Sequence, residues 1–257
     1  MTPIVTVDEA VTLSLVFSRI IALMMAFPLF NTPNIPLNIK VMLVLSLSFY
    51  LMKVTGVVVH LEPFSLYHFT MLIFKELILG FALGLLANFF ISAFSYAAEI
   101  ISYFMGLTVV NSFDPTFGQV SELSRFFLIL FFFIFFVSDA YSYFFASLAW
   151  SLKHLPLDLL TLHQGMWRYV IDLSKELFIL AFKLAFPFAL ILYIVNLALA
   201  LVNRLIPQIN VFIVGLPLQI FVGLAALAFG SSLLVYIGVD FLKEMSDDYV
   251  QVLKALG

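Results

Sequence analysis

Ionisable side chains lie within long apolar stretches of this 257-residue sequence, and they are the groups best able to do chemistry there. They are Arg19, Lys75, Glu76, Glu99, Arg125, Asp139, Lys175, Glu176 and Lys183. An ionisable group at the centre of a bilayer costs at least ~2.5–3.5 kcal/mol on insertion scales, so each needs a partner or a wet surface. The set could relay protons or ions, form structural pairs between helices, or lie outside the membrane. Because both signs occur and only Asp139 is deep in an apolar run, we favour structural pairs.

Sequence spacing indicates which of these charges can meet within one helix. Glu176 and Lys183 are seven residues apart and share a helix face. Lys75 and Glu76 are neighbours and should not face one another, so at least one of them needs a partner on another helix or another chain. The predicted set of buried charge pairs comprises Arg19, Lys75, Glu76, Glu99, Asp139, Glu176 and Lys183.

The residue combinations that most enzymes need are missing from the sequence. The four histidines are His60, His68, His154 and His163. They form no His-Glu-x-x-His pattern, and there is no cysteine to complete a zinc site. The sequence also lacks a Walker loop, a Gly-x-Gly-x-x-Gly stretch, and the Ser/His or paired-Asp patterns of intramembrane proteases. We therefore expect no enzymatic activity, no cofactor and no metal ion.

Composition defines the surroundings of these side chains. Hydrophobic residues make up 64% of the chain and charged residues 11%, with a mean hydropathy of +1.16, whereas soluble domains are ~45–50% apolar and ~25% charged. Too little polar surface remains for a soluble enzyme, a disordered chain, a coiled coil or a nucleic-acid binder. We predict one membrane-embedded domain over residues 1–257. Asp8 and Glu9, with no basic residue before them, argue against a cleavable signal peptide.

Helices are the expected elements, because the apolar runs are continuous and the backbone must pair with itself inside lipid. A span takes ~20 mostly apolar residues, and about six segments meet this need. They cover residues 10–30, 37–59, 65–105, 123–152, 169–203 and 209–242. These segments predict an all-α membrane protein.

Several segments are too long or too interrupted for simple spans. Residues 65–105 would measure roughly 60 Å as one helix against a core of ~30 Å, so this segment must kink, split or leave the bilayer. Gly80 and Gly84 are candidate weak points. Pro187 should bend its helix, and the last segment could break at residues 215–217, which read Gly-Leu-Pro.

The stretch from Gly106 to Glu122 combines turn residues with apolar side chains. Gly106 and Gly118 allow unusual backbone angles, and Asp114-Pro115 favours a turn. The apolar side chains between the glycines are Leu107, Val109, Val110, Phe113 and Phe117. Such a loop cannot lie bare in lipid, but it can line or fill a cavity inside protein. An ordinary connector outside the membrane is the alternative interpretation.

A second stretch, residues 204–223, places a Pro-Gln-x-Asn turn directly before an apolar segment that contains Gly215 and Pro217. Small residues permit close approach of neighbouring helices in membranes. Its side-chain amides, which could form hydrogen bonds between chains, are Gln208, Asn210 and Gln219.

These stretches resemble the FliR family, the R subunit of the flagellar export gate, and its counterpart in virulence type III secretion, the T subunit. The late signature is matched by Arg204, Pro207, Gln208, Asn210, Val211, Phe212, Gly215, Pro217 and Gly223. Earlier matches are Arg19, Pro28, Ile35-Pro36, Lys40, Glu76, Gly80, Gly84, Gly106 and Phe113-Asp114-Pro115. The resemblance covers nearly the whole chain. It departs at Ser138-Asp139-Ala140, where family members often carry Gly-His.

The resemblance implies a non-enzymatic subunit in the bacterial inner membrane at the flagellar basal body. With the P and Q subunits, its kinked helical hairpins would pack into a helical export-gate assembly that forms the pore for unfolded export substrates. A loop at about 106–122 would plug this pore. The implied plug residues are Val109, Val110, Phe113, Asp114, Pro115 and Phe117. The implied subunit-assembly residues are Arg204, Pro207, Gln208, Asn210, Gly215 and Pro217.

The further expected partners are other membrane subunits of the export apparatus, unfolded secreted proteins and membrane lipid, but no nucleic acid. The alternative function is that of a small secondary transporter of an ion or metabolite. Such a transporter should show inverted repeats with paired broken helices. Broken helices are expected here, but the sequence contains no internal repeat.

Overall fold

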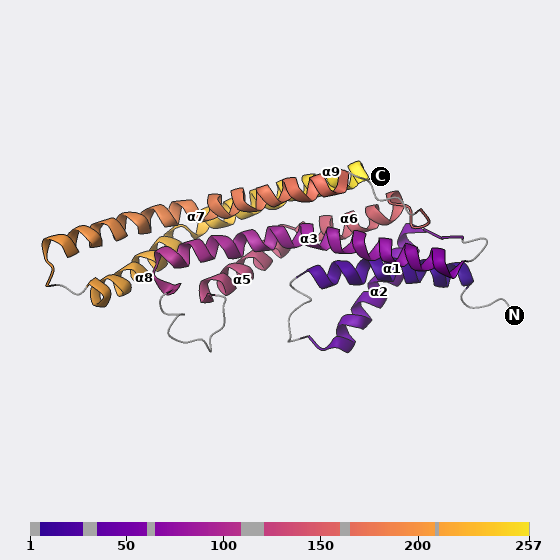
Figure 1. Cartoon of the computed structure of the whole chain (residues 1–257), viewed down its shortest axis with the longest axis horizontal. Coiled ribbons are helices and arrows are strands. Elements are labelled where there is room, and N and C mark those ends of the chain that lie inside the picture. Colours follow the sequence, from indigo (N-terminus) through magenta and orange to yellow (C-terminus); the bar gives the residue numbers. More distant parts are fainter. Residues whose placement is uncertain are drawn as a thin grey trace. The chain divides into compact units, whose positions relative to one another are not determined.

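The computed structural model of the chain describes residues 6–27, 35–60, 65–108, 121–159, 165–208 and 211–256. Within these ranges the regular elements are α-helices, and no strand occurs (Figure 1). The helices are α1 (Val7–Ala26), α2 (Leu37–Thr55), α3 (Leu66–Phe104), α5 (Glu122–Val137), α6 (Ala140–His154), α7 (Gly165–Leu205), α8 (Val211–Phe229) and α9 (Ser231–Leu256).

The helices are apolar enough to cross a membrane. Among the described residues, α1, α2, α3 and the part of α7 from Ser174 to Leu205 each have the length and composition of a span. The pairs α5–α6 and α8–α9 also qualify if each bent pair counts as one span, which raises the number from four to six. The prediction of an all-α membrane protein with about six hydrophobic segments is therefore confirmed.

The fourth and sixth apolar segments break at positions that the sequence analysis did not identify. Residues 123–152 form two helices, and Asp139 between them adopts a φ of +57°. Asp tolerates this left-handed conformation better than most residues do. The expected break at residues 215–217 is wrong, because α8 runs through Pro217, which removes only one backbone donor. The chain bends by 59° between α8 and α9 instead.

By its internal contacts the chain divides into two compact units. Unit 1 comprises residues 1–90, 141–174 and 245–257, and unit 2 comprises residues 91–140 and 175–244. In unit 1, the rings of Phe27 and Phe144 lie 5.4 Å apart between their centroids. In unit 2, Phe94 of α3 meets Phe131 of α5 edge to face at 5.1 Å. Each unit therefore has aromatic contacts of its own.

Helices α1 and α2 form a hairpin within unit 1 that is tied together by polar contacts near the start of α1. The α1 N-terminus carries a capping box, in which the side chains of Thr6 and Glu9 each accept a hydrogen bond from the other's backbone N–H. Glu9 also pairs with Lys53 of α2 at 3.0 Å. Just beyond α2, the N–H of Val59 donates to Thr12 Oγ1 at 2.9 Å. These contacts join the start of α1 to the end of α2, so the two helices run antiparallel.

Two glycines of α3 bring its backbone close to that of α1. A Cβ at position 80 would lie well inside contact distance of the Arg19 carbonyl oxygen, and one at position 84 would lie 2.6 Å from the Cβ of Ala26. Helix α3 is continuous over 39 residues through both positions. Gly80 and Gly84 are thus sites of close helix approach, and the expectation that they weaken α3 is wrong.

Substituting Gly80 with alanine should separate α1 from α3. The added methyl group has no space against the Arg19 carbonyl group, so we expect the free energy of unfolding to fall by about 1–3 kcal/mol. Thermal unfolding of the purified chain in mild detergent would measure the loss. The control is Ser14→Ala on an exposed position of α1, which should change stability little. Equal stability of the two variants would contradict the close approach.

Candidate functional site

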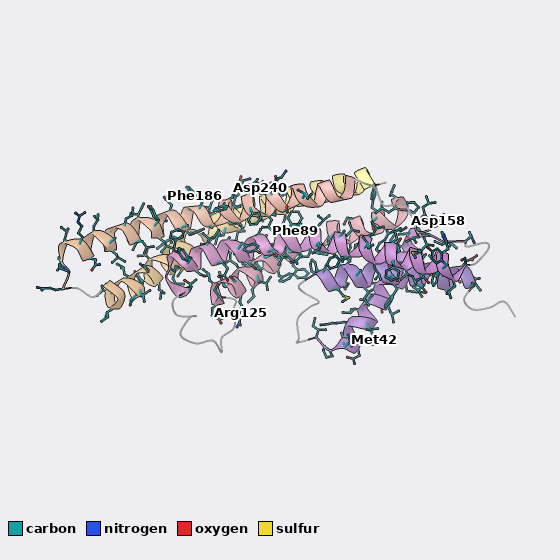
Figure 2. All side chains as sticks on the ribbon, viewed as in Figure 1. Met42, Phe89, Arg125, Asp158, Phe186 and Asp240 are labelled. Atoms are coloured by element: carbon teal, nitrogen blue, oxygen red, sulfur yellow. The ribbon has the colours of Figure 1, made fainter. Side chains whose placement is uncertain are left out.

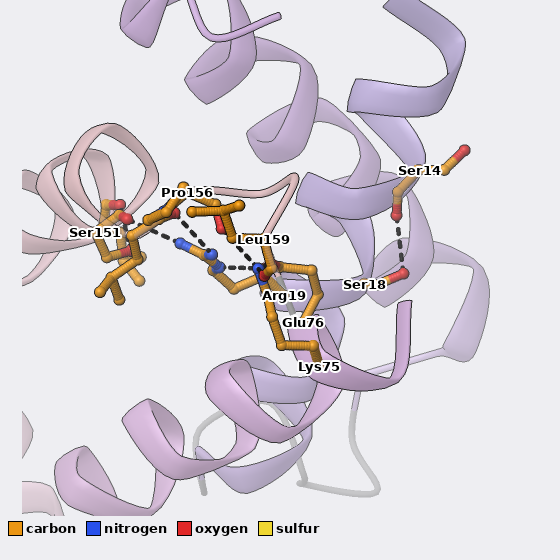
Figure 3. Close-up of polar contacts among 10 residues, drawn as sticks. Ser14, Ser18, Arg19, Lys75, Glu76, Ser151, Pro156 and Leu159 are labelled. Atoms are coloured by element: carbon orange, nitrogen blue, oxygen red, sulfur yellow. Dashed lines mark hydrogen bonds and ion pairs between the residues drawn. The ribbon is translucent and has the colours of Figure 1, made fainter. Parts of the chain in front are cut away.

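Three predicted charges come together in unit 1. Arg19 of α1 donates from Nε to Glu76 Oε2 of α3 at 2.5 Å, and Lys75 Nζ lies 2.8 Å from Glu76 Oε1 (Figure 3). The side chains of Arg19 and Glu76 are fully buried, and that of Lys75 is 4% exposed. We call these three residues the charge cluster.

The two cations of the charge cluster also hold the end of α6. Arg19 donates from Nη1 to the Ser151 carbonyl oxygen at 2.9 Å and from Nη2 to that of Leu155 at 3.3 Å. Lys75 Nζ donates to the carbonyl oxygens of Pro156 and Leu159 at 2.6 and 3.0 Å (Figure 3). Ser151 belongs to the last turn of α6, and the other three acceptors follow the end of this helix. The C-terminal end of a helix carries partial negative charge, so two cations suit this position.

The expectation that Lys75 and Glu76 do not meet is wrong. Both side chains turn toward the same point, where one carboxylate serves two cations. The contact between Lys75 and Glu76 Oε1 is an ion pair without a well-directed hydrogen bond, as expected for neighbours on a helix. The other part of the expectation agrees with the geometry, since Glu76 has its partner on α1.

Glu99 has a different environment from the charge cluster. In unit 2 its Oε1 accepts hydrogen bonds from the Ser121 N–H at 3.2 Å, from Ser121 Oγ at 3.0 Å and from Ser124 Oγ at 2.6 Å. Ser121 is the N-cap of α5. Among the described residues no cation pairs with Glu99, so the carboxylate instead meets the positive end of a helix.

The C-terminal end of α3 is held by a second polar contact within unit 2. Asn196 of α7 donates from Nδ2 to the Phe104 carbonyl oxygen at 3.2 Å, and Gln219 of α8 donates from Nε2 to Asn196 Oδ1. Sequence analysis assigned Gln219 to contacts between chains and did not identify Asn196. A single amide within an apolar helical run was the available signal.

Residues 109–120 connect these two held helix ends. Every implied plug residue belongs to this segment and lies outside the described residues, and Asn210 of the assembly set does too. The other assembly residues are described: Arg204, Pro207, Gln208 and Pro217 are exposed, and Gly215 is buried.

The remaining predicted charges are exposed in this chain. Asp139 lies at the break after α5, and Glu176 and Lys183 lie on α7. In the part of the chain that the structure describes, no ion pair links Glu176 to Lys183. Lys183 instead lines a groove of about 700 Å3 together with Phe186 and with Asp240 of α9, the last two labelled in Figure 2.

The chemical capacity of these groups is structural. Arg19 and Lys75 each bind carbonyl and carboxylate oxygens, and no described cluster of three His, Asp or Glu side chains could hold a metal ion. Long apolar helices, a buried cluster of opposite charges and two held helix ends define an integral membrane protein in which buried polar groups link helices.

Comparison with known proteins assigns the chain to a family. The family described as bacterial export proteins, family 1, matches residues 10–245, and the chain belongs to it. The flagellar biosynthetic protein FliR of Aquifex aeolicus is 34% identical over 87% of this chain and 86% of its own length. FliR of Bacillus subtilis is 32% identical over 80% of each chain, and FliR of Escherichia coli is 26% identical over 82% and 80%.

Removing the anion of the charge cluster should destabilise unit 1 strongly. Glu76→Leu leaves two buried cations without a counter-charge, and we expect the free energy of unfolding to fall by about 3–5 kcal/mol. Adding Lys75→Met removes one of these cations, so the double variant should regain part of the loss. Chemical unfolding of the purified chain in mild detergent would measure both.

The exposed pair between Glu9 and Lys53 provides the control for this series. Lys53→Met should leave the unfolding transition almost unchanged, because solvent screens that pair. A Lys75→Met/Glu76→Leu variant less stable than Glu76→Leu alone would contradict our account. It would mean that the contacts of Lys75 with the carbonyl groups outweigh its unpaired charge.

Proposed function

We propose that this protein is a non-enzymatic subunit of the export gate of a flagellar or type III secretion system. With P and Q subunits it would form the pore through which unfolded substrates leave the cytoplasm. Membership of the export family across residues 10–245 is the observation that carries this proposal. The relatives named FliR, which are similar over most of their length, favour the flagellar system and a location in the inner membrane at the basal body.

The loop at about 106–122 is proposed to act as the plug of this pore. Its support is that both helix ends that flank the loop are held within unit 2, the end of α3 by α7 and the start of α5 by α3. Glu99 holds the first turn of α5 through Ser121 and Ser124, and Asn196 binds the last carbonyl group of α3. We call the last turn of α3 and the first turn of α5 the stems, and these contacts hold both stems in place. Apolar side chains suit a plug, because they seal by buried area without requiring one specific partner.

The exposed polar residues of the late signature are proposed to contact neighbouring subunits. Arg204 lies in the last turn of α7, Pro207 and Gln208 follow the end of this helix, and all three are exposed on this chain. Glu176 and Lys183 are also exposed on an apolar helix, where hydrocarbon alone would disfavour them. Neighbouring subunits would provide their partners, whereas a solitary copy would leave them unpaired. Other export subunits, unfolded secreted proteins and lipid complete the proposed environment.

Removing the apolar plug should open the pore to ions. Deletion of residues 109–117 leaves Glu99, Asn196 and the stems in place, so the gate should assemble and leak. We expect the deletion to raise the permeability of the cell membrane to small ions, measured with a potential-sensitive dye in cells that carry the gate. A Gly/Ser segment of equal length should leak similarly, because it restores length without apolar area. An intact permeability barrier in both variants would reject the plug.

Mild detergent extraction distinguishes the gate subunit from the alternative transporter. We expect the chain to co-purify with P and Q subunits in stable amounts, measured by mass spectrometry of the purified complex. Charge reversal at Lys183, as Lys183→Glu, should reduce the P and Q yield if this exposed lysine contacts a neighbour. A lone monomer that binds a small solute would instead support a secondary transporter.

A further inference from the structure

A chain of polar contacts joins three apolar helices of unit 2 at the end of α3. The carbonyl group of Phe104 is the last of α3 and has no acceptor role within its own helix. Asn196 of α7 supplies the missing donor, and Gln219 of α8 in turn donates to Asn196. Each of the two amides therefore has its partner within this chain.

The backbone beyond Phe104 is fitted to the same helix, α8. Gly106 has a φ of +75°, which a side chain would strain. A Cβ there would lie 2.6 Å from Leu216 Cδ2 and 3.0 Å from Gln219 Oε1. Met105 is fully buried, and its Cγ lies 2.6 Å from where a Cβ at position 223 would be. The last turn of α3 therefore lies directly on α8, with Gln219 at the centre of the contact.

Apolar packing and the amide pair have different consequences at this contact. Leu216 and Met105 contribute buried apolar area, which changes little when one helix slides along another. The amide pair keeps its hydrogen bonds only in one register of α3, α7 and α8. Both amides are half-buried, and on their apolar side no water replaces a lost partner. The amides thus set the position of the turn at Gly106 more sharply than packing does.

We propose that Asn196 and Gln219 are positioning residues that set where the plug segment leaves α3. This inference rests on the proposed function, because it assigns to the two amides the placement of the proposed plug. Loss of either amide releases the last turn of α3 from α8, so the plug segment starts from a displaced point and seals poorly.

The test compares apolar replacements of the two amides with a swap that keeps an amide pair. Asn196→Leu and Gln219→Leu should each raise the ion permeability of cells severalfold, with the amount of assembled gate unchanged. Asn196→Gln combined with Gln219→Asn should return permeability toward the wild-type level. The matched control is Asn203→Leu, which removes an exposed amide from the same helix and should change neither quantity.

Disulfide cross-linking measures directly whether the end of α3 stays in contact with α8. The sequence contains no cysteine, so Met105→Cys with Gly223→Cys introduces a unique pair across the contact between α3 and α8. Oxidation should cross-link this pair efficiently in an otherwise unchanged chain and severalfold less in the Gln219→Leu background. Equal cross-linking in both backgrounds would overturn the positioning role even if the amide variants assemble poorly.

The outcomes separate this inference from the proposed function. Normal permeability of both leucine variants, alongside a leak in the deletion of residues 109–117, overturns the positioning role and leaves the plug intact. Permeability that changes only in proportion to the amount of assembled gate also overturns it, because the amides would then be merely structural. A deletion that does not leak rejects the plug and the positioning role together.

Discussion

The guanidinium of Arg19 is fully buried in a chain made mostly of apolar side chains. It requires hydrogen-bond acceptors, and other segments of unit 1 provide them. A buried cation without acceptors would be prohibitive, so three separate parts of the chain must converge on it. Helix α3 brings a carboxylate, and α6 with its connector brings two carbonyl groups. The positions of α1, α3 and α6 are thus set by one side chain that cannot be left unsatisfied.

The same requirement is met differently in unit 2. There Glu99 takes its donors from the serines at the start of α5, and Asn196 takes its acceptor from the end of α3. Among the described residues, Glu176 and Lys183 of α7 form no ion pair, and both are exposed. This contrast fits the proposal that neighbouring subunits provide the partners of Glu176 and Lys183.

Much of the fold could be predicted from the sequence, because hydropathy over ~20 residues is a strong signal for a helix in a membrane. The bounds of α1, α2 and α3 follow the apolar runs closely. Breaks were harder to predict. Asp139 holds a backbone angle more typical of glycine, and Pro217 does not interrupt its helix. The conformation of one residue changes the hydropathy of its surroundings very little, so a hydropathy pattern cannot locate such breaks.

Partners within the candidate site were less predictable than its members. The list of charges was readable, yet spacing along one helix could not indicate that Lys75 and Glu76 share a third partner from α1. Side-chain types do not indicate backbone carbonyl acceptors, although carbonyl oxygens accept four hydrogen bonds from Arg19 and Lys75. Asn196 escaped notice for the same reason, since its partner is a backbone oxygen.

The close approach of α1 to α3 at Gly80 and Gly84 restricts how the two helices can move against each other. Each glycine receives part of the α1 backbone, at Arg19 and at Leu23, one turn apart along both helices. Two such close contacts oppose both sliding and rotation of α1 against α3. The backbones would collide unless the two helices first moved apart. We therefore expect α1 and α3 to move together as one rigid element.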